Sequence, residues 1–359
     1  MRVQAFGSFD VARHPRVGIL IDGLRAHGVC VDLCNVPLEL STADRVQMLK
    51  QPWRLPLLAL SLLKTWITLV RRSRRLPRPD VVLVGYLGHF DVLLARRLFR
   101  DVPIVHDMLI FAGDTAADRG AGGVKQRLLR GLDRAAIRAS DVVVVDTEEH
   151  LAMLPPGTDG VVVPVGAPAT WAGPPPVDRT GPVRVVFFGL YTPLQGAPVI
   201  GAALGLLGPG IEVTMIGSGQ DLEATRELAG QAQVSWRDWV DPADLPGLVR
   251  GHDVCLGIFS ATGKGTRVVP NKVYQGAAAG CAIVTSDTPP QRRALGAAAV
   301  LVTPGDPAAL AAALDALAAD RTQLAAMRRS AWELAQVSYL PEAVVAPLLV
   351  RLREKGLRV

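Results

Sequence analysis

The sequence predicts two α/β domains, each built on a parallel sheet covered by helices. Strand-like apolar runs alternate with helical stretches through both halves of the chain, and this alternation is typical of parallel sheets with crossover helices. The length of 359 residues exceeds the usual size of one hydrophobic core, so two cores are expected. A proline-rich break near the middle separates the two series.

The N-terminal domain is predicted to span 1–168. It opens with a short buried strand that ends in a turn at Gly7, and a helical pattern follows over 16–28. Further strands are expected at 29–34, 81–84, 103–106, 141–146 and 160–163. After Val165 the sequence loses its periodicity and becomes rich in proline, which predicts a linker over 169–182.

The C-terminal domain is predicted to span 183–335. Its strands are expected at 184–189, 211–217, 234–236, 254–258, 282–285 and 299–302. The last segment, about 336–359, reads as helical with a break at Pro341, and we expect it to pack back on the first domain.

Composition narrows the possible functions. Nearly half of the residues are apolar and a fifth are charged, which excludes disordered and collagen-like classes. The four cysteines show no paired spacing, so no metal site is assigned, and the first residues lack a signal-peptide pattern, so a cytoplasmic protein is expected. The formal charge of +6 suits a partner that is an anion, namely donor phosphates, an acidic membrane face or nucleic acid.

The most apolar segment, 55–70, precedes a cluster of five arginines that ends at Arg78. The segment is shorter than the roughly 20 residues that span a bilayer and contains Lys64, so spanning is not expected. Two interpretations remain. One is a domain-packing helix with a solvated basic end. The other is peripheral contact of 55–78 with the inner face of an anionic membrane or with a lipid acceptor.

A second set of arginines, at 127, 130, 134 and 138, falls on one face of a predicted helix. This face is either solvated or part of a groove for an anionic substrate or lipid head group. Nucleic acid is not expected as a partner, because no stacking aromatic residues alternate with the basic ones.

Glycine turns in the second half provide the first candidate site. Gly189 and Gly196 flank the turn after the first strand, where glycines let backbone N–H groups and a helix N-terminus approach a phosphate. Gly217 ends the next strand in a Gly-Ser-Gly turn. The position three after Gly219 is Leu222, so the dinucleotide fingerprint of a nicotinamide enzyme, a rival interpretation, is incomplete.

A basic loop precedes the helix that is predicted to begin near Pro270. Lys264 and Arg267 in this loop and Lys272 in the helix can neutralise a diphosphate together with the helix dipole. Gln275, one turn into the helix, can hydrogen-bond a ribose.

These segments resemble, in order and spacing, the retaining glycosyltransferases of family 4. The motifs are the 189–196 turn, the 216–219 turn, the run Pro-Asn-Lys-Val-Tyr at 270–274, which contains Asn271, Lys272 and Val273, and the run 280–285. The resemblance implies a GT-B fold, that is, two Rossmann-like parallel-sheet domains facing each other across a cleft. It also implies that the C-terminal domain holds a nucleoside diphosphate sugar of UDP or GDP type, that a small-molecule or lipid-linked acceptor binds the N-terminal domain, and that the sugar keeps its anomeric configuration without a metal or cofactor.

The sequence departs from the family pattern at four positions. Leu190 and Gln195 stand where the family usually has an arginine and a lysine for the diphosphate, and Arg267 and Gln275 stand where two glutamates are common. We expect Arg267 and Lys272 to return the lost positive charge, since phosphate sites tolerate relocation of point charges. A divergent enzyme is therefore expected, and a non-catalytic donor-binding or scaffold protein is the alternative.

Candidate residues in the N-terminal half lie at the ends of predicted strands, where ligands bind in open α/β sheets. Gly7 is expected to let the chain pass close to the donor phosphate. His89 and the pair His106 and Asp107 are the candidate catalytic residues, with a structural role as the alternative. A polar loop with Asp114, Asp118 and Arg119 either contacts acceptor or sugar, or caps a helix.

Overall fold

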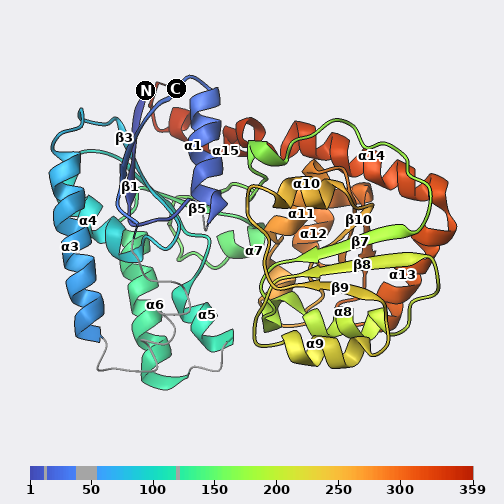
Figure 1. Ribbon diagram of the computed structural model, residues 1–359. Coiled ribbons are helices and arrows are strands. Elements are labelled where there is room, and N and C mark those ends of the chain that lie inside the picture. The colour runs from blue at the N-terminus through green and yellow to red at the C-terminus, as the bar shows by residue number, and fades with distance from the viewer. Residues whose placement is uncertain (12–13, 38–54, 119–121, 359) are drawn as a thin grey trace. The chain divides into compact units, whose positions relative to one another are not determined.

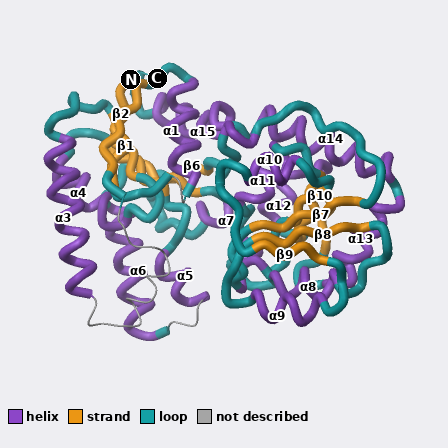
Figure 2. Tube along the Cα trace, viewed as in Figure 1, coloured by secondary structure: helices purple, strands orange, loops and turns teal. Residues whose placement is uncertain are grey.

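The computed structural model describes residues 1–11, 14–37, 55–118 and 122–358, and the chain divides into two compact units (Figure 1). Unit 1 comprises Met1–Val145, Leu151–Val163 and Val345–Val359, and unit 2 comprises Asp146–His150 and Pro164–Val344. Each unit contains one six-stranded sheet in which all strands are parallel, flanked by helices (Figure 2). The predicted α/β class with two Rossmann-like sheets is confirmed.

The sheet of unit 1 has the order β2-β1-β3-β4-β5-β6. Its strands are β1 (Arg2–Gly7), β2 (Cys30–Asn35), β3 (Val81–Val84), β4 (Ile104–Asp107), β5 (Val142–Val145) and β6 (Gly160–Val162). Its helices are α1 (Pro15–Ala26), α3 (Leu55–Ser73), α4 (His89–Leu98), α5 (Ala112–Asp118) and α6 (Gly123–Arg138), and the short α7 (Glu148–Leu151) follows β5. Strands β3 and β5 are continuous apolar runs, as expected for parallel strands that helices cover on both faces of the sheet.

The sheet of unit 2 has the order β12-β11-β10-β7-β8-β9. Its strands are β7 (Val183–Phe188), β8 (Ile211–Ile216), β9 (Val234–Arg237), β10 (Val254–Leu256), β11 (Ala282–Ser286) and β12 (Ala299–Val302). Its helices are α8 (Ala197–Leu204), α9 (Leu222–Ala229), α10 (Leu245–Arg250), α11 (Asn271–Ala278), α12 (Pro289–Leu295), α13 (Pro307–Ala319) and α14 (Arg321–Ser338), and α15 (Pro341–Glu354) ends the chain.

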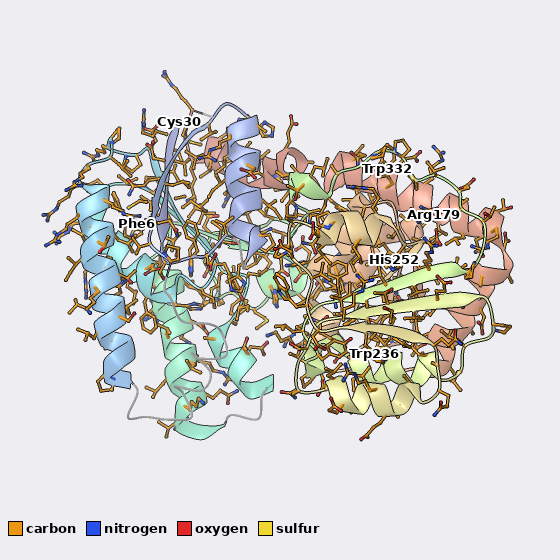
Figure 3. All side chains as sticks on the ribbon, viewed as in Figure 1. Phe6, Cys30, Arg179, Trp236, His252 and Trp332 are labelled. Atoms are coloured by element: carbon orange, nitrogen blue, oxygen red, sulfur yellow. The ribbon has the colours of Figure 1, made fainter. Side chains whose placement is uncertain are left out.

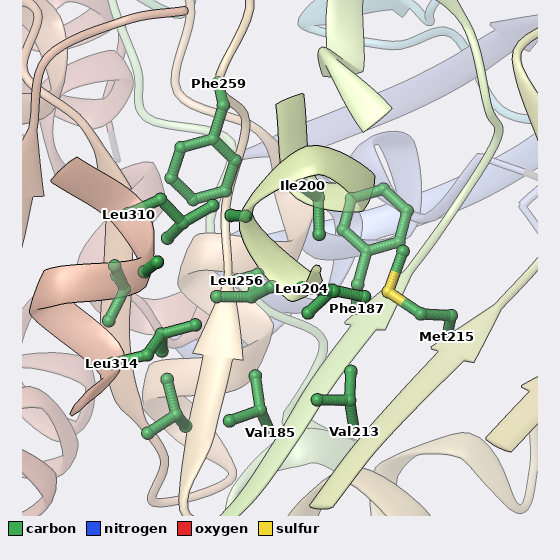
Figure 4. Packing of buried hydrophobic residues seen from close by; sticks show 14 of the residues in the cluster. Val185, Phe187, Ile200, Leu204, Val213, Met215, Leu256, Phe259, Leu310 and Leu314 are labelled. Atoms are coloured by element: carbon green, nitrogen blue, oxygen red, sulfur yellow. The ribbon is translucent and has the colours of Figure 1, made fainter. Parts of the chain in front are cut away.

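The core of unit 2 lies between the sheet and helices α8, α9 and α13. Side chains of β7 and β8, such as Phe187 and Met215, interlock there with Ile200 of α8 and Leu310 of α13 (Figure 4). All four are fully buried, so the apolar alternation read from the sequence is realised as one continuous core.

The segment 169–182, predicted to be a linker, belongs to unit 2. Trp171 is buried there and stacks on Phe188 with ring centroids 5.4 Å apart. Arg179 donates to the carbonyl of Arg250 at 2.6 Å, and Trp332 donates to the carbonyl of Gly173 at 3.0 Å (Figure 3). Proline-rich composition indicated a break in periodicity, but these anchors attach the segment to the unit.

At the other end of the chain, α14 stays in unit 2 and 345–359 belong to unit 1. In unit 1, Arg351 and Lys355 both pair with Asp159, at 2.6 and 2.5 Å. Within the described ranges no single helix has the length and apolarity of a membrane span; α14 and α15, bent by 41°, meet that test as a pair by length and composition only.

Candidate functional site

The candidate site of unit 2 lies at the carboxyl edge of its sheet. Strand β7 is central, with β8 on one side and β10 on the other, so the chain order reverses between β7 and β10. In open α/β sheets, ligands bind in the crevice outside the carboxyl ends of strands at such a reversal. Gly189 follows β7 and the loop 257–265 follows β10, so two of the predicted segments meet at this point.

Glycines bring the backbones of this edge close together. Gly217 has φ +123°, and a Cβ placed on it would lie 1.9 Å from the carbonyl oxygen of Gly189. Gly196 has φ +65°, and its Cβ would lie 2.5 Å from the backbone nitrogen of Ser260. Two of the predicted turns therefore need glycine for steric reasons as well as for their dihedral angles.

Lys272, the second residue of α11, supplies a buried cation at this edge. Its side chain donates from Nζ to Oε1 of Gln195 at 2.5 Å, and Nζ lies 3.7 Å from the centroid of the Phe187 ring. The residue is only 4% exposed, and this burial lowers the pKa of its ammonium to about 7. A Cβ on Gly189 would lie 3.2 Å from Nζ, so the Gly189 turn, Gln195 and Lys272 form one group.

This group gives a physical account of one departure from the family pattern. Gln195 occupies the position where the family usually has a lysine, and here its amide oxygen reaches the ammonium of Lys272. A positive charge is thus present beside residue 195 although residue 195 does not carry it. Leu190, the other departure, is 65% exposed and brings no charge.

The remaining predicted donor residues differ in accessibility. Gln275 is buried one turn after Lys272, and Asn271 is exposed at the start of α11. Arg267 and Lys264 are half-buried in the loop before α11, and the carbonyl of Arg267 accepts a 2.9 Å hydrogen bond from Thr147. Val273, in contrast, is fully buried, so we assign its side chain to the core of unit 2.

Two residues of this site were missed in the sequence. Phe187 faces the Lys272 ammonium with its ring, and nothing in an apolar strand pattern distinguishes it from a core residue. Ser260 organises the basic loop, since its hydroxyl bonds Thr262 Oγ1 at 2.9 Å and accepts from the Thr262 backbone nitrogen at 3.1 Å. A Ser-x-Thr run beside a glycine was the available signal for such a loop.

In unit 1, His106 and Asp107 at the end of β4 are enclosed by protein. His106 is fully buried, and neither of its ring nitrogens has a hydrogen-bond partner among the described residues. Asp107 pairs with the equally buried Arg16 at 3.2 Å, and Arg16 also donates to the carbonyl of Val163 at 2.9 Å. Enclosure of this kind favours the structural alternative for both residues over the catalytic one.

His89 begins α4 and belongs to the same polar group. Its Nε2 lies 3.0 Å from Oδ1 of Asp133, and its ring meets that of His106 edge-on at 5.7 Å. Asp133 in turn accepts hydrogen bonds from the backbone nitrogens of Ala112 and Gly113, both at 2.9 Å. His89 therefore helps to connect α4, α6 and the start of α5.

Gly7 lies in a turn held by a buried carboxylate that the sequence did not reveal. Gly7 has φ +144°, and Oδ2 of Asp91 accepts from both the backbone nitrogen and the hydroxyl of Ser8 at 2.7 Å. The other oxygen of Asp91 accepts from the indole of Trp66 at 3.0 Å. Arg119, also predicted as a contact residue, lies outside the described residues, as does the side chain of Asp118.

The burial of His106 predicts a pH-dependent stability. Desolvation, with a smaller contribution from His89, lowers the pKa of His106 to about 3, whereas an unfolded histidine titrates near 6.5. Between these values the unfolded state binds a proton that the folded state does not, so the free energy of unfolding is expected to fall as pH decreases from 6.5, by up to about 1.4 kcal/mol per pH unit. Urea unfolding from pH 7 to 4.5 measures this slope.

The His106→Leu variant is expected to show a shallower slope, and His27→Leu, on the surface of the same unit, serves as control. Parallel pH curves for the wild type and His106→Leu would contradict the prediction.

The described part of the chain contains no group of three or more His, Cys, Asp or Glu side chains arranged to hold a metal ion. Comparison with known families gives two matches. Residues 182–320 match the family described as glycosyl transferases group 1, and residues 14–166 match the glycosyl transferase 4-like domain. No curated protein matches the chain by sequence.

Several solved structures share the fold over nearly the whole chain. Sucrose-phosphate synthase from Thermosynechococcus elongatus is 14% identical with a TM-score of 0.75, covering 99% of both chains. HepE of Anabaena, in complex with UDP and glucose, is 13% identical with a TM-score of 0.67, covering 99% of this chain and 100% of its own. A trehalose-6-phosphate protein of E. coli bound with UDP-2-fluoro glucose is 14% identical with a TM-score of 0.68, covering 99% of both.

At such identities the structural similarity establishes the fold, and the two family matches establish the relationship. Together these matches cover both halves of the sequence. The chain belongs to the glycosyltransferases of GT-B fold that resemble family 4.

Proposed function

We propose that this protein transfers a hexosyl or related sugar from a nucleoside diphosphate sugar to a small-molecule or lipid-linked acceptor, with retention of configuration and without a metal ion. The observation that carries the proposal is the buried ammonium of Lys272 beside the Gly189 turn, faced by the neutral groups of Gln195 and Phe187. A cation removed from water and faced by neutral partners gains most from an anion that takes the place of its hydration.

The chemistry of the predicted donor ligands supports transfer without an enzyme nucleophile. Lys264, Arg267 and Lys272 are cationic and the other side chains are neutral, so none of them offers a carboxylate for a covalent intermediate. Stabilising the departing diphosphate would be the main contribution of Lys272 and of the N-terminus of α11. The acceptor then attacks from the face that the diphosphate leaves.

Uridine donors are the first to test. UDP or a UDP-sugar accompanies HepE and the E. coli protein, which share this fold, and we extend that preference to this chain as a proposal, with GDP donors as the second choice. The test is a thermal-shift titration with UDP, GDP, ADP, dTDP and NAD, with and without EDTA, followed by assay of sugar release from the donor that binds. A shift with NAD alone would rule out the proposal, and loss of turnover in EDTA would remove its metal-independent part.

A non-catalytic donor-binding protein is the second candidate. The exposed Leu190, at a position where the family usually has an arginine, favours it, because that turn then contributes no side-chain charge to the diphosphate. Binding of a nucleoside diphosphate sugar without hydrolysis or transfer to any of a panel of alcohols, amines, thiols and polyprenyl phosphates would favour this candidate over the enzyme.

The pKa of Lys272 predicts that donor affinity depends on pH. Burial lowers its pKa to about 7, and a bound diphosphate favours the protonated form. The Kd for UDP-glucose is therefore expected to be nearly constant below pH 7 and to rise above it, by up to about tenfold per pH unit. Calorimetry at pH 6, 7, 8 and 9 measures this; a flat profile over that range would mean that Lys272 does not titrate with donor binding.

Peripheral membrane contact through 55–78, and with it a position at the inner face of a membrane, is part of the proposal. Leu60, Leu63 and Ile67 are exposed along α3, and the exposed arginines 71, 72, 74, 75 and 78 follow them. Trp66 does not belong to this stripe, since its indole donates to Asp91 inside the unit. The side chains of Leu55, Leu57 and Leu58 lie outside the described part of the chain.

The α3 stripe predicts binding to anionic vesicles. Leu63→Glu is expected to weaken co-sedimentation with phosphatidylglycerol vesicles about tenfold, because it replaces an apolar contact with a carboxylate near anionic head groups. Leu206→Glu is the matched control, since Leu206 in unit 2 is 58% exposed and Leu63 is 52% exposed. Equal binding by both variants would remove α3 from the membrane contact.

A further inference from the structure

Unit 1 contains an open pocket of about 460 Å³ that includes none of the predicted donor residues. One wall is α6, another is the start of α5, and the third is the segment 153–156 after α7. Volumes of this size are typical of small-molecule sites, which usually combine an apolar lining with a few polar groups.

The floor of the pocket is apolar and firmly packed. Phe111 and Ile137 line it, and both are buried members of a cluster with Val143 and Val145 of β5. Met153 also lines the pocket and packs against the same cluster. An apolar ligand group placed here would extend an existing hydrophobic core.

Two arginines of α6 add positive charge to this floor. Arg130 and Arg134 are one turn apart, both line the pocket, and both are exposed. No hydrogen bond or ion pair of either guanidinium is found within the described residues. Guanidinium groups at this spacing can bind the oxygens of one phosphate or carboxylate together.

The carboxylate of Asp133, which also lines the pocket, is already engaged. It accepts from the backbone nitrogens of Ala112 and Gly113 and faces His89, so it does not neutralise the arginines as a surface ion pair would. Gly113 allows α5 to lie directly on α6, because its Cβ would be 2.5 Å from Cγ of Arg130. The stem of Arg130 is thereby held against α5, which reduces the entropy lost when its head binds a ligand.

Asp114 is the remaining ionisable group of the lining. It lies in the first turn of α5 and is half-buried. Its carboxylate can accept a hydrogen bond from a hydroxyl of a ligand whose anionic group is at the arginines.

We infer that this pocket binds an amphipathic anion, with a phosphate or carboxylate at Arg130 and Arg134 and an aliphatic or aromatic body on Phe111, Ile137 and Met153. All residues that line the site belong to unit 1, and none of them belongs to the donor group around Lys272, so the inference goes beyond the proposed sugar transfer. Neither the arginine pair nor the apolar floor is expected to bind a ligand well alone. Exposed arginines bind a free phosphate weakly, and the apolar floor has no polar group that would orient a ligand.

Calorimetry with octyl phosphate tests the inference on the full chain. Saturable binding is expected, at least about tenfold tighter than for inorganic phosphate or octanol, since charged hydrogen bonds and apolar burial each contribute. Arg130→Gln and Arg134→Gln are each expected to weaken binding about tenfold. Arg127→Gln, on the same helix but outside the pocket lining, is the matched control and is expected to bind as the wild type does.

Lys272→Met is a second control, expected to leave octyl phosphate binding unchanged. Its result separates this site from the donor site, so failure of one proposal does not decide the other. Met153→Gln is expected to weaken octyl phosphate but not inorganic phosphate, which tests the apolar floor. Absence of binding, equal affinity for inorganic phosphate, or equal binding by the wild type and both arginine variants would overturn the inference.

A soluble metabolite and a lipid head group both present this chemistry. Phosphatidylcholine vesicles with and without phosphatidic acid distinguish them. If Arg130→Gln and Arg134→Gln reduce binding to the acidic vesicles as they reduce octyl phosphate binding, the anion is a lipid head group. If they reduce only octyl phosphate binding, the ligand is a soluble amphipathic anion.

Discussion

Lys272→Met is expected to lower kcat/KM for the sugar donor by about 100-fold or more. Removing one charge that is aimed at a leaving group in a water-poor site typically costs this much. Methionine has nearly the length of lysine and keeps the contact with the Phe187 ring, so the change removes the charge and the hydrogen bond to Gln195 while preserving packing. Initial-rate kinetics, together with donor binding by calorimetry, measures the effect.

The lower kcat/KM of Lys272→Met is not expected to result from unfolding of the variant. The pKa of Lys272 is lowered to about 7 in the folded state, so between pH 7 and the ordinary pKa near 10.4 the unfolded state holds a proton that the folded state releases. Stability therefore rises with pH across this window, and burying the ammonium costs stability at neutral pH. Lys272→Met is expected to be at least as stable as the wild type at pH 7.

Lys264→Met is the matched control for the loss of charge. Lys264 is half-buried in the loop before α11, so solvent screens its charge and a loss of less than about tenfold is expected. If Lys272→Met keeps donor affinity within about threefold of the wild type while Lys264→Met loses it, the diphosphate is held by the loop and not by the buried cation.

Gly217→Ala is expected to destabilise the protein by about 3 kcal/mol or more. Its Cβ would lie 1.9 Å from the carbonyl oxygen of Gly189, and a backbone atom cannot turn aside as a flexible side chain can. The φ of +123° adds the cost of a conformation that residues with a Cβ rarely adopt. Urea unfolding measures the change.

Gly210→Ala separates these two causes. Gly210 also has a positive φ, +89°, and it precedes the same strand, β8, but its Cβ would meet no atom within 4 Å. A loss of about 1–2 kcal/mol is expected from the dihedral alone. If both variants lost the same free energy of unfolding, the contact with the Gly189 carbonyl would add no cost. The turns after β7 and β8 would then be able to move apart to make room for the Cβ.

The glycine turns show how far the sequence could predict the site. Gly189 and Gly217 were recognisable because each follows an apolar run that reads as a strand, and parallel strands end at one edge of a sheet. Gly196 was recognisable because it ends the turn that begins at Gly189. The sequence did not reveal that Gly217 lies against Gly189 itself. Contact between two turns depends on which strands are neighbours, and strand order is a property of the whole sheet.

The charges show the limit more clearly. In the sequence, Gln195 indicated that a cation of the family pattern was missing, because a motif is compared position by position along the chain. In the folded unit, the ammonium of Lys272, 77 residues away in the sequence, is hydrogen-bonded to it. Burial was equally hidden: His106 and Asp107 end a strand as predicted, but the helices over that strand and the guanidinium of Arg16 enclose them.

The sequence by itself determined two α/β units, their parallel sheets and the edge at which the glycine turns gather, because these follow from local periodicity and turn chemistry. Only the tertiary structure decided that 169–182 packs as part of unit 2, that Lys272 supplies the charge beside Gln195, and that α5, α6 and 153–156 line an open pocket. Each of these depends on contacts between residues far apart in the chain, and the packing of whole elements, not the local pattern, brings them together.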